Sequence, residues 1–184
     1  MVALSKALAD EHGIRLPVTL TDKFPHLRFE ARNVRYLGDS VDATRVPQSL
    51  TGLRTMFNAF HHFAPAAARS VLVDAVRAQQ PIAIFEFSNR RLRSMIPFLF
   101  TPLYVAVATP FIRPFRWARL FWTYVVPLVP VTSWWDGIVS QWRAYTPEEL
   151  LQLAEGLDGY QWSAARVPVF GASGYLTYLL GLPE

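Results

Sequence analysis

Four short stretches in the first half of the chain each combine apolar residues with a polar end, and this repeated pattern constrains the fold most. They are residues 18–22, 41–44, 56–62 and 82–86. Open α/β sheets bind ligands outside the carboxyl ends of their parallel strands. A chain that places aspartate, asparagine and histidine at successive strand ends is therefore expected to build a ligand site at one edge of such a sheet.

Helical patterns separate these strands along the chain. The sequence predicts a short helix over 3–12 that Gly13 closes, a helical turn over 47–53 and a helix over 66–79. A further helix runs from Thr146, as N-cap, to about Gly156. The predicted strands are 18–21, 34–37, 54–60, 81–87, 160–167 and 175–180. Alternating strands and helices favour a mainly parallel sheet with helices on both faces.

An uncharged region interrupts this order. Apolar residues make up 52% of the 184 residues and charged residues 17%, against about 25% in ordinary domains. Residues 94–112 and 120–135 carry no charge, and three arginines, Arg113, Arg116 and Arg119, lie between them. The sequence therefore divides into two α/β parts, 1–93 and 136–184, and an apolar insertion over 94–135.

The insertion has two interpretations. Prolines within both uncharged runs argue against a straight spanning helix, and tryptophans lie near their ends. One interpretation is a helical hairpin that dips into or lies on a membrane face. The other is a soluble lid or dimer interface. Both favour an apolar substrate such as a lipid, and Asp136 is either a polar group at the pocket mouth or a helix cap.

Composition excludes several other classes. Cysteine is absent, which rules out disulfides and thiolate metal sites. The net charge is +4 without a lysine-rich run, so nucleic acid is not an expected partner. The first residues lack the basic start and apolar core of a signal peptide. We therefore expect a cytoplasmic protein that is peripheral or monotopic at the membrane.

Each polar strand end has a chemical interpretation and a structural alternative. A carboxylate at Asp22 can accept both hydroxyls of a ribose, and one at Asp42 can accept from an adenine amine. Either aspartate could instead stabilise a turn. Asn58 and His61 could orient a substrate or accept a proton. Adjacent histidines without a nearby carboxylate at ligand spacing are weak evidence for a metal.

Residues 19–25, 41–44 and 54–63 together resemble the class I S-adenosylmethionine-dependent methyltransferases. The resemblance covers roughly residues 1–90 and 145–182. It implies that Asp22 binds the ribose, that Asp42 with Ala43 lies beside the adenine, and that Asn58 and His61 lie nearest the chemistry. It also implies that His62 points the other way.

The resemblance lacks one part of the family pattern. The first strand and its glycine-rich turn should precede the first helix, yet the residues before Pro17 fit that helix alone. We therefore expect a Rossmann-like methyltransferase sheet that is incomplete at the N-terminus and carries an inserted apolar helical hairpin. An unpaired sheet edge also makes a homodimer plausible.

Two functions follow from these observations. The first is methyl transfer from S-adenosylmethionine to an apolar or lipid-like acceptor. The alternative is a non-catalytic membrane-associated or interaction module derived from the same fold.

Overall fold

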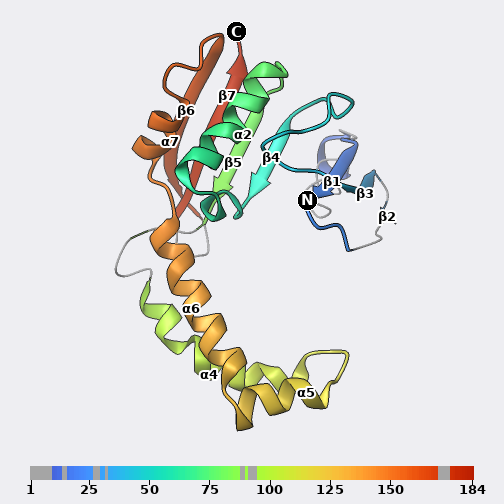
Figure 1. The fold of residues 1–184 in the computed structure, drawn as a ribbon, viewed down its shortest axis with the longest axis vertical. Helices are drawn as coiled ribbons and strands as arrows, with labels where there is room; N and C mark the ends of the chain where they lie inside the picture. Colours follow the sequence, from blue (N-terminus) through green and yellow to red (C-terminus); the bar gives the residue numbers. More distant parts are fainter. Residues whose placement is uncertain are drawn as a thin grey trace. The chain divides into compact units, whose positions relative to one another are not determined.

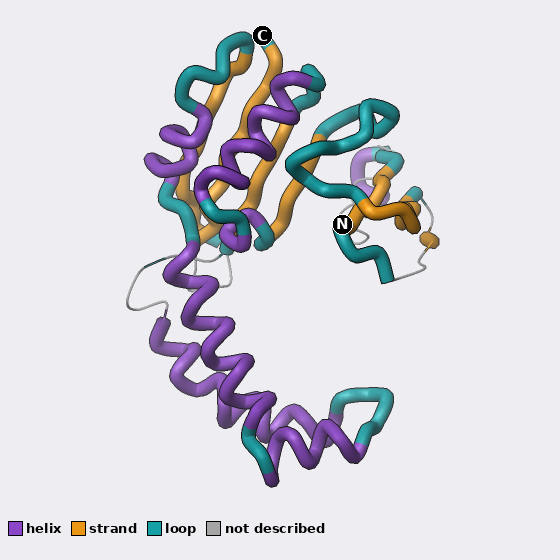
Figure 2. Tube along the Cα trace, in the orientation of Figure 1, coloured by secondary structure: helices purple, strands orange, loops and turns teal. Residues whose placement is uncertain are grey.

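The computed structural model describes residues 10–13, 16–26, 30, 31, 33–87, 90, 95–169 and 175–184. The chain forms two compact units, Met1–Thr51 and Gly52–Glu184, and each is described by itself. Figure 1 labels the helices and strands, and Figure 2 follows them along the chain. The boundary between the units differs from the divisions at residues 93 and 135 that the sequence favours.

The first unit contains a three-stranded sheet. Its order is β1-β3-β2, and β1 runs parallel to β3 while β2 runs antiparallel to it. The strands are β1 (Val18–Asp22), β2 (Glu30–Ala31) and β3 (Val34–Ser40). The strands predicted over 18–21 and 34–37 are thus confirmed, and β3 continues for three further residues.

Two helical predictions fall in this unit. Most of the predicted helix over 3–12 lies outside the described residues; residues 10–12 are helical, and Gly13 follows with φ +66°. The helical turn predicted over 47–53 is wrong. Leu50 N donates to Pro47 O at 3.0 Å in a single turn, and Gly52 then adopts φ +105°, which no right-handed helix contains.

The second unit contains a four-stranded sheet with the order β4-β5-β7-β6. Strands β4 and β5 are parallel, whereas β7 runs antiparallel to both of its neighbours. The strands are β4 (Arg54–Phe57), β5 (Ile82–Glu86), β6 (Tyr160–Pro168) and β7 (Tyr175–Pro183). The fold is therefore mixed α/β with parallel strands in both sheets. Fewer of its strand pairs are parallel than the mainly parallel sheet predicted from the sequence would have.

Helix α2 (Pro65–Arg77) links β4 to β5 and packs beside α7 (Pro147–Ala154) on the sheet, as Figure 1 shows. Its buried side chains include Leu72, and Ile82 and Ile84 of β5 are fully buried as well. The Arg54 guanidinium donates to the Asp74 carboxylate at 2.7 Å, which ties β4 to α2.

Helix α7 begins as the sequence predicts. Glu149 N donates to Thr146 Oγ1 at 3.3 Å, and Thr146 N donates to Glu149 Oε2 at 2.9 Å. These reciprocal bonds form a capping box, which satisfies two backbone donors that a helix start leaves open.

Residues 95–143 form a series of helical pieces. They are η2 (Ile96–Phe100), α4 (Thr101–Ala108), η3 (Thr109–Phe111), α5 (Trp117–Leu120), the π-helical η4 (Phe121–Val125) and α6 (Leu128–Arg143). Figure 1 shows α4 beside α6, and the Phe98 ring lies against Gly137 of α6. Within the described parts of the chain, no helix has the length and apolar character needed to cross a membrane.

Helix α6 extends beyond the predicted end of the insertion at residue 135. Asp136 therefore lies inside this helix, with its side chain exposed, and the helix-cap interpretation of Asp136 is wrong. The arrangement of the insertion as a single hairpin stays a prediction.

We expect Gly181→Ala to lower the free energy of unfolding by about 1–3 kcal/mol. A Cβ at Gly181 in β7 would overlap the Trp162 ring, which a hydrogen bond from its Nε1 to Leu157 O at 3.2 Å holds in place. Gly38→Ala in β3 is the matched control, since among the described residues, its two chain neighbours aside, no atom lies within 4 Å of the added Cβ. Urea unfolding followed by circular dichroism measures both variants, and an equal loss in the two would contradict this packing.

Candidate functional site

Asp22 and Asp42 follow the carboxyl ends of neighbouring parallel strands in the first unit. Asp22 is the last residue of β1, and Asp42 comes two residues after β3. Val41 N donates to Asp22 O at 2.9 Å, so the two chain segments stay together beyond the paired strands. The two carboxylates therefore follow the carboxyl ends of neighbouring parallel strands.

The Asp22 carboxylate has one engaged oxygen. Phe24 N donates to Asp22 Oδ1 at 2.9 Å, which forms a local turn. No donor to Oδ2 is present in the part of the chain that the structure describes. The turn role that the sequence allowed for Asp22 is thus real, and it leaves one acceptor oxygen for a ligand.

The Asp42 carboxylate is more fully engaged. Thr44 donates to Oδ1 from both its backbone N at 2.9 Å and its hydroxyl at 2.7 Å, and Lys23 Nζ lies 2.7 Å from Oδ2. The Lys23 ammonium, followed by the Thr44 donors, holds the pKa of Asp42 well below its usual range. Ala43 lies in the same turn and is half-buried. An adenine amine would share Asp42 with these donors.

Asn58 joins the ends of β4 and β5 in the second unit. Its backbone N donates to Phe85 O at 2.7 Å, and its Oδ1 accepts from Phe87 N at 3.3 Å. Its φ of +49° lies in the left-handed region, which asparagine tolerates better than most residues. The turn after β4 is therefore fixed to β5, with the Asn58 side chain exposed.

A buried carboxylate organises the residues that follow. Glu86, at the end of β5, accepts from Phe60 N at 2.6 Å, and its other oxygen lies 2.5 Å from His61 Nδ1. Phe60 begins η1 (Phe60–His62), the short helix after β4. The exposed fractions of the His61 and Glu86 side chains are only 2% and 1%. Asn58 and His61 thus lie on one short loop, but His61 packs inward.

His62 differs from His61 in exposure. Its side chain is exposed, and its ring centre lies 4.2 Å from that of His61. The solvent-facing polar groups on this loop are therefore Asn58 and His62. Glu86 is the polar end of the stretch 82–86, but it is not among the residues that the sequence predicts for the site; an acid that ends an apolar strand is the signal that marks it.

A row of polar residues continues from Glu86 across the sheet. Thr177 of β7 pairs with Glu86, and Arg166 of β6 pairs with Thr177. Thr177 Oγ1 and Arg166 Nε are buried without a hydrogen-bond partner in the described structure.

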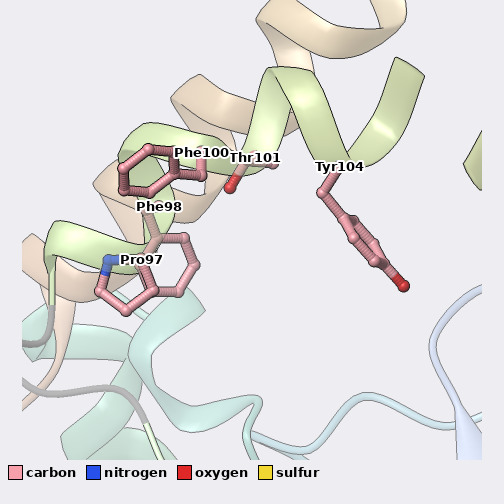
Figure 3. Close-up of a pocket in the computed structure, with 5 residues that line it drawn as sticks. All are labelled: Pro97, Phe98, Phe100, Thr101 and Tyr104. Atoms are coloured by element: carbon pink, nitrogen blue, oxygen red, sulfur yellow. The ribbon is translucent and has the colours of Figure 1, made fainter. Parts of the chain in front are cut away.

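A cavity of about 430 Å³ lies on the helical pieces of the insertion (Figure 3). It is lined by Pro97, Phe98, Phe100, Thr101 and Tyr104. It is an open depression rather than an enclosed pocket, and its lining is mostly apolar. None of these five residues belongs to the predicted site. Among the described residues, no group of three or more potential metal ligands gathers.

Comparison with known proteins assigns no family. No family model and no curated protein matches the chain. One similar solved structure comes from Rhodobacter sphaeroides and is assigned to the Zn-dependent alcohol dehydrogenases. It is 13% identical, and the match covers 98% of this chain and 70% of that one, with a TM-score of 0.44. A likeness of this size carries no argument about function.

We expect Lys23→Met to raise the pKa of Asp42 toward its ordinary value of 3.8. The lowered pKa stabilises the folded state above the unfolded pKa, and this stabilisation disappears as the pH falls through the folded pKa. Carboxyl ¹³C NMR titration of Asp42 measures the change. Arg45→Met is the control, because no hydrogen bond or ion pair from its side chain to Asp42 is present; an equal rise would exclude a specific Lys23 contact.

We expect Glu86→Gln to loosen the loop after β4. The Phe60 amide should lose roughly tenfold or more of its protection from hydrogen exchange, because a hydrogen bond to a buried charge contributes about 1.5–3 kcal/mol. Glu155→Gln, at an exposed acid, should leave the exchange rate unchanged. Unaltered Phe60 protection in Glu86→Gln would show that this carboxylate does not hold the loop.

Proposed function

We propose that this chain is a methyltransferase-like α/β domain that binds S-adenosylmethionine and acts on an apolar or lipid-like acceptor. The observation that carries the proposal is the placement of Asp22 and Asp42 after the neighbouring parallel strands β1 and β3. Within the second unit, Asn58 and η1 follow β4. Ligand sites of open α/β sheets lie at such carboxyl ends.

The strand pairing supports the Rossmann-like part of this proposal. Strand β1 pairs parallel with β3 in the first unit, and β4 pairs parallel with β5 in the second. Open α/β folds of this class are built on such parallel pairs.

The acidic residues differ in how well they fit an adenosine group. Asp22 Oδ2 is available to accept from a ribose hydroxyl, which agrees with its proposed role. Asp42 and Ala43 could lie beside the adenine, but the Asp42 oxygens already accept from Lys23 and Thr44. We therefore assign most of the binding free energy on this side to Asp22.

The residues of the second unit would act on the methyl acceptor. S-Adenosylmethionine supplies an activated methyl group, and transfer by direct displacement depends mainly on positioning. In this proposal the exposed Asn58 amide orients the acceptor. Because His61 Nδ1 lies beside Glu86, its Nε2 is the nitrogen that would take a proton from the methyl acceptor. This step requires the buried His61 ring to become accessible.

A non-catalytic membrane-associated or interaction module is the second candidate. The burial of His61 favours it, since a proton acceptor must come within hydrogen-bond reach of its substrate. The second candidate is also favoured by Asp42, because its carboxylate oxygens already accept hydrogen bonds from Lys23 and Thr44.

Calorimetric titration with S-adenosylmethionine tests the binding proposal. We expect measurable heat, competition by adenosine, and an affinity lower by roughly 10- to 100-fold in Asp22→Asn, because a hydrogen bond to a charged group contributes about 1.5–3 kcal/mol. Asp39→Asn is the matched control, an exposed acid in β3. No heat at millimolar ligand would exclude the enzyme function for this chain.

Methyl transfer is measured separately, with isotope-labelled S-adenosylmethionine and a lipid extract as acceptor. Label in the lipid fraction supports the enzyme. Binding without transfer supports the second candidate.

A further inference from the structure

In the insertion, many apolar side chains are exposed, which is the reverse of the usual distribution in a water-soluble domain. Of the 27 large apolar side chains that are exposed in the described structure, 18 lie within residues 95–135. Phe111 and Trp117 are 79% and 78% exposed. The buried residues of the same stretch are Thr109, Thr123 and Pro130. Water-soluble domains bury apolar side chains and rarely leave such a concentration of them on the surface.

Hydrogen bonds within the insertion satisfy its polar side chains locally. Thr109 Oγ1 donates to Val105 O at 2.6 Å, and Thr123 Oγ1 donates to Arg119 O at 2.8 Å. The Tyr124 hydroxyl donates to Ala106 O at 2.5 Å, which links η4 to α4. Such bonds matter most where no water is present to replace them.

The charges of this stretch are all positive. Arg113, Arg116 and Arg119 are its charged residues, and no acid occurs from 95 to 135. Arg113 and Arg116 are exposed, whereas Arg119 donates to Ile112 O at 3.0 Å. The Trp117 ring packs edge-on against Phe115, with ring centres 5.2 Å apart. Arginines beside exposed aromatic rings match the polar headgroup layer of an anionic bilayer.

The helical pieces are too short to cross a bilayer. Helix α4 has eight residues and is about 12 Å long, against roughly 30 Å of hydrocarbon. Its surface is apolar on all sides apart from hydroxyl groups, so no polar face directs it back onto the protein. The longest helix that begins in the stretch, α6, has 16 residues and is about 24 Å long, which is also less than this thickness.

We propose that residues 95–135 insert into one leaflet of an anionic phospholipid bilayer and lie in its interface, with Arg113 and Arg116 at the headgroups. The occupant of this apolar surface is the lipid, because the arginines supply charge complementarity and the helices lack the length to span. This inference identifies a partner and holds whether or not the chain transfers methyl groups.

Vesicle co-sedimentation of the full chain tests the proposal. We expect the protein to sediment with phosphatidylcholine vesicles that contain roughly one-third phosphatidylglycerol, and less with phosphatidylcholine alone, since each arginine near an anionic surface contributes about 1 kcal/mol. Arg113→Gln/Arg116→Gln should weaken binding to the anionic vesicles by about 5- to 30-fold. The control Arg45→Gln/Arg77→Gln removes the same charge from exposed positions outside the stretch.

A second pair of variants tests the apolar contribution. Phe111→Ser/Trp117→Ser should weaken binding to both kinds of vesicle. Phe24→Ser/Leu53→Ser removes exposed apolar side chains elsewhere and should leave binding unchanged. Circular dichroism shows whether each variant is folded.

Three results would overturn the proposal. The first is no binding to either kind of vesicle, and the second is an equal loss of vesicle binding in the control variants. The third is a stable dimer that does not bind vesicles and that Phe111→Ser/Trp117→Ser dissociates. Because the assay contains no S-adenosylmethionine, a failure of cofactor binding leaves its outcome unaffected.

Discussion

The buried Glu86 carboxylate is the interaction on which the proposed acceptor side of the molecule depends. It binds the Phe60 amide and the His61 ring at once, and so joins the end of β5 to the loop after β4. A buried charge is unfavourable unless it is paired and hydrogen-bonded, so Glu86 and this loop must be ordered together. The loop then presents Asn58 and His62 to solvent and His61 to the interior.

The second unit contains two regions in which apolar side chains are distributed in opposite ways. Around β5 and α2, apolar side chains such as Leu72 and Ile84 are fully buried, as in any water-soluble α/β protein. Within residues 95–135, most large apolar side chains are exposed, whereas Thr109 and Thr123 are buried. The same chain therefore has one core organised against water and one surface suited to an apolar medium.

The α/β part of the second unit and the apolar stretch 95–135 both suit the proposed function. A site that modifies an apolar acceptor gains from a surface that holds the protein at the membrane, since the acceptor is concentrated there. The cavity beside α4 has a mostly apolar lining. The proposed lipid-binding surface and the proposed methyl transfer are nevertheless separate properties, and each stands on its own residues.

Local patterns in the sequence determined the existence and type of most described elements. The apolar run of β5, the apolar side of α2 and the Thr146 cap were predictable because each depends on neighbours a few residues away. Only the tertiary structure decided that β7 pairs antiparallel with β5, that Lys23 engages Asp42 and that Glu86 holds His61 inside. Those outcomes depend on contacts between residues far apart in the chain, and on burial, which no local pattern encodes.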